Sequence, residues 1–286
     1  MRAKFTKGIH SLVVKVGTSV LTRNGRFDRR IVDRLAEQIS RFLKKGMRVS
    51  IVSSGAIGGG MTILKMTKRP GTMEGLQGAA AVGQRYLMQC YEESFAKRGF
   101  STAQVLLTWD DLAQHKRFLN AKRTLKEIQK WGLVPIINEN DTVATDEIGF
   151  GDNDRLSSLL AILVEADAQV ILSDTDGLFS GNRHAPANRI RKVERMTRTI
   201  FSHVKDTRNP FTVGGMRSKL GAIRMSVTSG VPVFLADGRA REVLARIFNG
   251  EDVGTLFLPD LKKGRSRKDW LEHFLKYVKK PVKNNL

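Results

Sequence analysis

The chain has 286 residues, of which 41% are hydrophobic, enough for one large α/β domain or two modest domains with a buried core. Its 49 Lys and Arg outnumber its 28 Asp and Glu, and the formal charge of +21 would suit nucleic acid, an anionic membrane or small polyanions. The single cysteine, Cys90, excludes a disulfide framework within the chain.

No apolar run is long enough to cross a membrane and no signal-peptide pattern follows Met1, so we expect a soluble cytoplasmic protein. Zinc-finger and RNP-type patterns are also missing from the sequence, which favours a solvated basic surface over a nucleic-acid interface. Cys90 lies within a helical pattern and is interpreted as a buried structural thiol.

The first predicted strand, Ser11 to Val16, ends in a turn of Gly17, Thr18 and Ser19. Backbone N–H groups freed by such a turn can line an anion, and Lys15 adds a positive charge beside them. The alternative is a solvated lysine at the edge of a strand. A helix is predicted over 29–45 from its apolar spacing.

The second predicted strand, Val49 to Val52, ends in small residues from Ser53 to Ala56 and continues to Gly58, Gly59 and Gly60. Glycines this dense predict a loop that lets backbone approach a ligand closely. Neither a P-loop nor a dinucleotide fingerprint occurs in the chain.

Helices are next predicted over 75–97 and 117–131, and strands over 103–107 and 133–137. Strands that alternate with helices at this spacing indicate a mostly parallel sheet with helices on both faces.

The stretch from Asn138 to Asp154 is rich in acidic and amide groups, and it lies between the strand at 133–137 and a helix predicted over 155–165. Open α/β sheets bind ligands just beyond the carboxyl ends of their strands. A ligand with an amine and a carboxylate could be held there. The alternative is a polar turn in which Asp154 caps the helix.

Polar residues also follow the strand predicted at 170–172, beginning with Ser173 and Asp174. The segment from Val213 to Lys219 places glycines before a helix and a lysine in its first turn, which predicts a phosphate site. A flexible loop before a helix is the alternative. A strand at 231–236, a helix at 240–249 and an edge strand at 255–258 complete the predicted body.

Six motifs in this order resemble the amino acid kinase family, and within it the members that phosphorylate glutamate. They are VVKVGTS from Val13, SSGA from Ser53, RFLNA from Arg117, NEND from Asn138, GDND from Gly151 and GGMxxK from Gly214. The resemblance covers residues 9–258 and implies a three-layer αβα sandwich with a mostly parallel open sheet. It places a kinase domain at 1–260, followed at 261–286 by a basic tail, expected to be helical, in place of the PUA domain that many members carry.

The same resemblance implies phosphorylation of the γ-carboxylate of L-glutamate by ATP with Mg²⁺, the first step toward proline. A homodimer or homotetramer and feedback inhibition by proline are typical of such members. The implied glutamate site consists of Ser54, Gly55, Ala56, Asn138, Asp141 and Asn153. The implied ATP site consists of Lys15, Gly17, Ser173, Asp174, Val213, Gly214, Gly215, Met216, Arg217, Ser218 and Lys219.

Lys15 and Lys219 would flank the transferred phosphoryl group, and Asp154 would orient both lysines. A carboxylate nucleophile is already ionised at neutral pH, so the reaction needs no general base. We assign no protein residue as a metal ligand. Two departures from the family pattern, around Thr212 to Lys219 and around Ser180 to Pro186, affect the nucleotide contacts.

Two other functions remain open at this point. One is a different kinase of the family, acting on acetylglutamate, aspartate, carbamate or a nucleotide. The other is a basic scaffold or RNA-binding protein on an inactive kinase fold, which the charge of +21 favours and the lysines and aspartates at the expected catalytic positions oppose.

Overall fold

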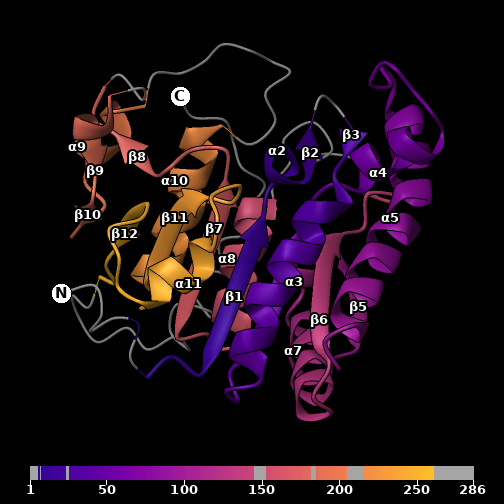
Figure 1. Cartoon of the computed structure of the whole chain (residues 1–286), viewed down its shortest axis with the longest axis horizontal. Helices are drawn as coiled ribbons and strands as arrows, with labels where there is room; N and C mark the ends of the chain where they lie inside the picture. Colours follow the sequence, from indigo (N-terminus) through magenta and orange to yellow (C-terminus); the bar gives the residue numbers. More distant parts are fainter. Residues whose placement is uncertain are drawn as a thin grey trace.

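The computed structural model describes residues 6, 8–23, 26–144, 153–181, 185–204 and 215–260. Its centre is an eight-stranded sheet with the order β10-β12-β11-β7-β1-β4-β6-β5 (Figure 1). The strands from β11 to β5 are parallel, and β12 pairs antiparallel with β11. The strand bounds are β1 Ser11–Val16, β4 Arg48–Ser53, β5 Thr102–Leu107, β6 Val134–Glu139, β7 Ala168–Ser173, β10 Lys192–Val193, β11 Val233–Asp237 and β12 Thr255–Phe257.

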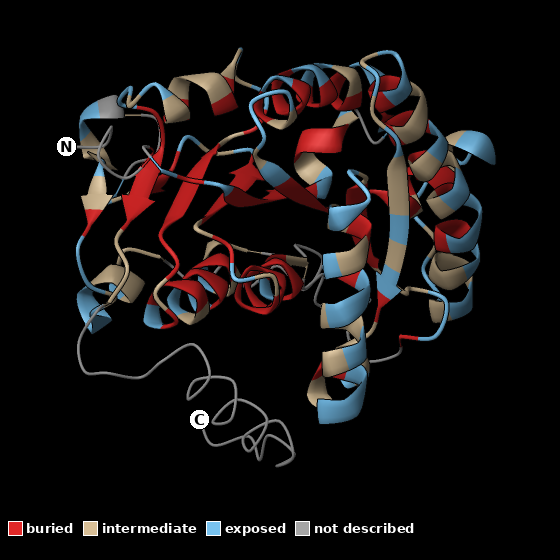
Figure 2. Cartoon of the chain, turned by 90° about the horizontal axis from the view of Figure 1, so that it is seen from below, coloured by how far each residue is buried: buried red, intermediate tan, exposed pale blue. Residues whose placement is uncertain are grey.

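Helices cover both faces of this sheet, so that the buried strands run between two helical layers (Figure 2). One layer contains α2 (Thr18–Leu21), α3 (Arg29–Leu43), α5 (Met73–Ala96) and α11 (Val243–Phe248). The other contains α6 (Trp109–Ala113), α7 (His115–Lys130), α8 (Asn153–Leu163) and α10 (Met216–Thr228). The predicted αβα sandwich is therefore confirmed.

The remaining elements are short. They are α4 (Ala56–Ile63), α9 (Arg198–Ser202), the 3-10 helix η1 (Pro186–Asn188) and two antiparallel pairs, β2 (Thr22–Arg23) with β3 (Arg26–Phe27) and β8 (Leu178–Phe179) with β9 (Arg189–Ile190). No helix within the described ranges is both long and apolar enough to cross a bilayer.

Alternation along β1 determines which side chains face which layer. Leu12, Val14 and Val16 pack in the core of the α3 and α5 layer, whereas Val13 packs in the core of the α8 layer. Because side chains of a strand alternate between faces, Lys15 lies on the same face as Val13. A central strand thus carries a lysine into the layer that contains α8 and α10, so the alternative of a solvated lysine at a strand edge is wrong.

The prediction of a glycine-rich loop at 58–60 is also wrong, because these residues lie within α4. A Cβ atom on Gly60 would lie 1.8 Å from the Ala79 carbonyl oxygen, and one on Gly83 would lie 1.8 Å from the Ala56 carbonyl oxygen. The glycines therefore allow α4 and α5 to cross with their backbones in contact. Among the glycines from 55 to 60, only Gly55, at φ 101°, needs the conformational freedom of a turn glycine.

Three boundaries differ from the prediction. Strand β6 continues through Glu139, so Asn138 is the fifth residue of the strand and does not follow it. Helix α8 begins at Asn153, which places Asp154 inside the first turn and excludes the N-cap alternative. Strand β12 is not at the edge, since the two-residue β10 pairs with its other side. The predicted tail at 261–286 lies outside the described residues.

Candidate active site

The predicted site residues gather at the carboxyl edge of the sheet around β1. This strand lies between β4 and β7, which is where the order of connections reverses. Parallel strands end at a common edge, so Val16, Ser53, Glu139 and Ser173 terminate on the same side of the molecule. Ligands of open α/β sheets bind at such a switch point.

Two lysines from distant parts of the chain share one carboxylate at this edge. The Lys15 Nζ lies 2.7 Å from Asp154 Oδ1, and the Lys219 Nζ lies 3.1 Å from Asp154 Oδ2. The Asp154 side chain is 0% exposed, whereas the two lysine side chains are 5% and 11% exposed. Strand β1, helix α8 and helix α10 thus bring together three residues that are far apart in the sequence.

Charge balance keeps Asp154 ionised. Burial by itself would raise the pKa of Asp154, but the ammonium groups of Lys15 and Lys219 outweigh it and hold that pKa below its ordinary value. A carboxylate with a low pKa is a poor proton acceptor. Asp154 is therefore suited to orient the two ammonium groups, not to act as a general base.

A buried network of hydrogen bonds holds the backbone of Asp154 in place. The hydroxyls of Ser157 and Ser158 donate to the Asp154 carbonyl oxygen at 2.6 and 3.2 Å. The Gln169 side chain on β7 donates to Ser157 at 2.7 Å and accepts from Ser226 on α10 at 2.5 Å. One glutamine therefore joins the helix that carries Asp154 to the helix that carries Lys219.

We expect Gln169→Leu to lower the free energy of unfolding by about 1–3 kcal/mol, because the hydroxyls of Ser157 and Ser226 would lose a buried partner. Urea titration would measure this change. Since the Gln169 amide does not reach the carboxyl edge of the sheet, turnover should fall while KM values stay close to those of the unchanged protein. A KM shift larger than the loss of turnover would contradict a positioning role for Gln169.

A second group of residues forms an amide and hydroxyl cradle beside the lysines. The Asn153 Nδ2 donates to Ser54 Oγ at 2.9 Å and to Asn138 Oδ1 at 3.1 Å. The Ser54 backbone N–H donates to the Val16 carbonyl at 3.0 Å, which fixes the cradle to the end of β1. Gly55 and Ala56 follow directly and begin α4.

Two polar atoms of this cradle are buried and have no partner among the residues that the structure describes. They are Asn153 Oδ1, an acceptor, and Gln84 Nε2, a donor. Gln84 lies on α5 and accepts from Asn138 Nδ2 at 2.8 Å. Buried polar groups are normally satisfied, so these two atoms suit a ligand that has both a donor and an acceptor. Sequence reasoning missed Gln84, which has no motif around it.

Asp141 lies two residues after β6 and is half-buried. Burial raises the pKa of Asp141 to about 6, and the nearby Arg69 opposes that rise. A carboxylate that is costly to desolvate is a suitable partner for a ligand cation, which would restore its charge balance.

The residues predicted to hold a nucleotide lie on the other side of the lysines. Gly17 donates its N–H to the Leu172 carbonyl at 3.1 Å, and a Cβ at this position would lie 3.5 Å from Lys15 Nζ. A side chain at position 17 would therefore pack against the ammonium group of Lys15, and glycine leaves that space open. Ser173 is buried at the end of β7 and donates to the exposed Asp174 at 3.1 Å.

Helix α10 begins after Gly215 with Met216, Arg217 and Ser218, and its N-cap makes no side-chain hydrogen bond. Backbone N–H groups of an uncapped first turn attract anions. Lys219 follows directly, so helix and lysine can bind the same anion. Val213 and Gly214, also predicted for this site, lie outside the described residues.

Comparison with known proteins identifies the family. Residues 11–237 match the model of the amino acid kinase family. The chain belongs to the amino acid kinase family. This amino acid kinase is 45% identical over 262 residues to a glutamate 5-kinase of Chromohalobacter salexigens, covering 91% of the chain and 69% of that relative. It is also 45% identical over 274 residues to a glutamate 5-kinase of Pseudomonas syringae pv. tomato, covering 95% and 73%.

The solved structure of UMP kinase from Bacillus anthracis has a similar fold. It superposes with a TM-score of 0.56 at 17% identity and covers 88% of this amino acid kinase and 97% of that chain. The family model and the two relatives confirm the family predicted from the six motifs, whereas the likeness to this solved structure shows only the fold.

Proposed function

We propose that this amino acid kinase transfers the γ-phosphoryl group of ATP to the γ-carboxylate of L-glutamate, giving ADP and γ-glutamyl phosphate for proline synthesis. The observation that carries the proposal is its 45% identity, over nine tenths of the chain, to glutamate 5-kinases. The paired lysines and the adjoining cradle supply the chemistry that such a reaction needs.

In this reaction a γ-carboxylate oxygen attacks the γ-phosphorus, and the bond from that phosphorus to the β,γ-bridging oxygen breaks. No proton is transferred, because the nucleophile is already an anion and ADP leaves as one. The main obstacle is repulsion between carboxylate and triphosphate. Positioning and positive charge therefore carry the catalysis.

We assign Lys15 and Lys219 to the two sides of the transferred phosphoryl group. Each would move little from its present place, because Asp154 already holds both ammonium groups at 2.7 and 3.1 Å. Preorganised charges stabilise a transition state without reorganisation at the moment of reaction. Asp154 would thus serve as the positioning residue for both.

We assign the cradle to glutamate. The ammonium group of the substrate would donate to Asn153 Oδ1 and be balanced by Asp141, and a substrate carboxylate would accept from Gln84 Nε2 and Ser54. Gly55 and Ala56 would contribute backbone at the start of α4. Asn138 would keep Asn153 and Gln84 in place through its own hydrogen bonds.

The ATP phosphates would lie between Gly17 and the first turn of α10, with Ser173 and Asp174 at the nucleoside side. The donors there fit a polyphosphate, since they are backbone N–H groups and two ammonium groups. Mg²⁺, when bound, would neutralise phosphate charge and is usually held through substrate phosphates with one or two carboxylates. Proline inhibition and a dimeric or tetrameric assembly stay predictions.

The raised pKa of Asp141 gives a pH dependence. The ordinary pKa of this carboxyl is 3.8 and burial raises it to about 6. As pH falls, Asp141 is therefore protonated in the folded state at a higher pH than in the unfolded state. The stability that this protonation contributes is present below pH 3.8 and is lost as pH rises through 6. Below pH 6 the carboxyl becomes neutral and loses its attraction for the substrate ammonium.

We therefore expect kcat/KM for glutamate to fall up to about tenfold per pH unit below pH 6, as one proton is taken up. Initial rates between pH 5 and 8 would measure this, a range in which the substrate carboxylates stay ionised. Asp141→Asn should give a lower kcat/KM without the step near pH 6. A step of the same size in this variant would assign the titration to another group.

A direct assay tests the proposed reaction. ADP release would be followed by a coupled assay, and hydroxylamine would trap the acyl phosphate as a hydroxamate. We expect both products with L-glutamate and at most background with N-acetylglutamate, aspartate, carbamate or UMP. A preference for any of these acceptors would contradict the proposal. A parallel run with proline tests the predicted feedback inhibition.

A further inference from the structure

An arginine-lined trough lies beside the kinase centre, on the α3 side of the sheet. It consists of three adjoining hollows of about 500, 290 and 530 Å³. The 500 Å³ hollow lies in the middle. It shares Ile31 and Arg34 with the 290 Å³ hollow, and Arg23, Asp28 and Arg30 with the 530 Å³ hollow. The surrounding elements are α2, the β2–β3 pair, α3 as far as Arg41 and the loop after β11. The basic residues along it are Arg23, Arg26, Arg30, Arg34, Arg41, Arg239 and Arg241.

Every basic side chain that lines these hollows is arginine, although lysine is common elsewhere in the chain. A guanidinium group presents a planar fork of N–H donors that matches two oxygens of a phosphate, whereas an ammonium group is a point charge. A merely solvated basic surface needs no such selection. The composition of the trough therefore indicates recognition of an oxyanion.

The negative charges nearby are already engaged. Asp28 accepts from Arg30 at 2.9 Å, and this hydrogen bond holds the pKa of Asp28 below its ordinary value. Arg41 pairs with both Glu37 and Glu242. By contrast, Arg23 and Arg34 form no ion pair with any carboxylate in the described part of the chain.

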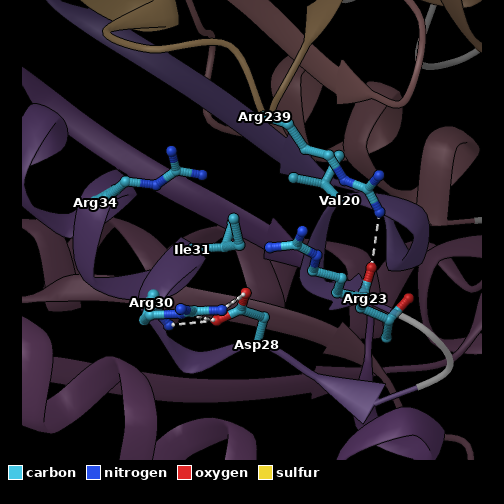
Figure 3. Close-up of a pocket in the computed structure, with 8 residues that line it drawn as sticks. Val20, Arg23, Asp28, Arg30, Ile31, Arg34 and Arg239 are labelled. Atoms are coloured by element: carbon cyan, nitrogen blue, oxygen red, sulfur yellow. Dashed lines mark hydrogen bonds and ion pairs between the residues drawn. The ribbon is translucent and has the colours of Figure 1, made fainter.

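The side chains converge over an apolar floor. Figure 3 shows Arg23 and Arg34 extending from opposite sides toward the space beside Ile31, with Arg239 above Val20. Arg239 donates to the backbone carbonyls of Ser19 and Thr22, the latter at 2.7 Å, so that its guanidinium is fixed in place. Like charges that converge from separate elements repel one another, and a bound anion would relieve that repulsion.

We propose that this trough is a second anion site, which binds a ligand carrying two or more linked phosphates. Arg23 and Arg34 are the main contacts, and Arg239 is a third, preoriented contact. The ligand is either a free oligophosphate or the backbone of a nucleic acid, since both present the same oxygens. Three adjoining hollows suit several phosphates in a row.

The trough adjoins the kinase centre, since Gly238 of its lining donates its N–H to the Ser173 carbonyl at 2.9 Å, but different side chains line the two sites. Val20 and Ile31 belong to the core between the sheet and α3, whereas Asp154 and Lys219 lie on α8 and α10 of the opposite layer. The proposal therefore does not depend on the glutamate reaction. Arg23 and Arg34 have no part in that reaction, and their replacement should leave its turnover within about twofold.

The test compares two double variants of equal charge change. Arg23→Gln/Arg34→Gln removes the two exposed arginines that we assign as the main contacts of the trough, and Arg48→Gln/Arg123→Gln removes two exposed arginines at the start of β4 and on α7. Titration calorimetry with inorganic tripolyphosphate at 0.15 M salt measures binding. We expect two binding events in the unchanged protein and in the control, one at the ATP site and one at the trough. In the trough variant, binding at the trough should weaken at least about tenfold while the other event is unchanged.

A second titration identifies the source of the phosphates, using a fluorescent single-stranded oligonucleotide at several salt concentrations. If nucleic acid is the source, the trough variant should bind it at least about tenfold more weakly, with a salt slope reduced by roughly 1.4 for two lost contacts. Weaker binding of either probe confined to the trough variant supports the site. Equal binding by both variants, or an equal loss in both, overturns it.

Discussion

Lys219→Ala is expected to lower turnover by about a hundredfold or more while the protein still folds. Loss of one preorganised charge at a transition state raises the barrier by about 3 kcal/mol. Asp154 would keep Lys15 as a partner at 2.7 Å, so its buried charge would not be left alone. Initial rates of hydroxamate formation at saturating glutamate and ATP would measure the effect.

The matched control is Arg224→Ala, which removes an exposed cation from the same helix at a distance from the triad. Its turnover should remain within about twofold of the unchanged protein, because an exposed charge contributes little at this range. If Lys219→Ala also kept nearly normal turnover, the assignment of Lys219 to the transferred phosphate would be wrong.

Asp154→Asn should affect both stability and activity. It removes the carboxylate that the neighbouring buried cations Lys15 and Lys219 both contact. Removing one partner of a buried ion pair typically lowers the free energy of unfolding by about 3–5 kcal/mol. Urea unfolding would measure this loss, and the assay above should detect no turnover beyond background, since neither lysine keeps its orientation.

The pH dependence of this loss has a definite sign. The pKa of Asp154 is lowered in the folded state, so its contribution to stability is present above pH 3.8 and is lost as pH falls through the folded pKa. The unchanged protein should show this decline, and Asp154→Asn should show a smaller one, because the lowered pKa values of Asp28, Asp33 and Asp111 still contribute. Asp33→Asn, the same change in a partly exposed pair with Arg98, is the control and should lower the free energy of unfolding by no more than about 1 kcal/mol.

The parts of the fold that depend on local pattern could be predicted. Strand β1 is bounded by Ser11 and Val16 in the sequence and in the structure, because a β-branched run followed by Gly17 has one simple interpretation. The sequence also predicts that Lys15 lies near the end of a strand and that Asp154 and Lys219 each lie near the start of a helix. Their meeting at the edge of the sheet follows from the parallel topology.

What could not be predicted depends on contacts between distant segments. Gly60 and Gly83 are needed because two helices cross there, and a glycine-rich run gives no sign of the partner helix that it will contact. Gln84 and Gln169 are single polar residues in otherwise unremarkable helix and strand patterns. Their roles depend on Asn138 and on Ser157 and Ser226, which only the folded chain brings close.

The most direct test of the central claim is a crystal structure with Mg²⁺, L-glutamate and a non-hydrolysable ATP analogue. The account predicts that Lys15 Nζ and Lys219 Nζ both contact γ-phosphate oxygens at about 3 Å, the usual distance of a charged hydrogen bond. The glutamate γ-carboxylate should face the same phosphorus, with its ammonium group at Asn153 and Asp141. A γ-phosphate away from either lysine, or glutamate bound outside this cradle, would contradict the account.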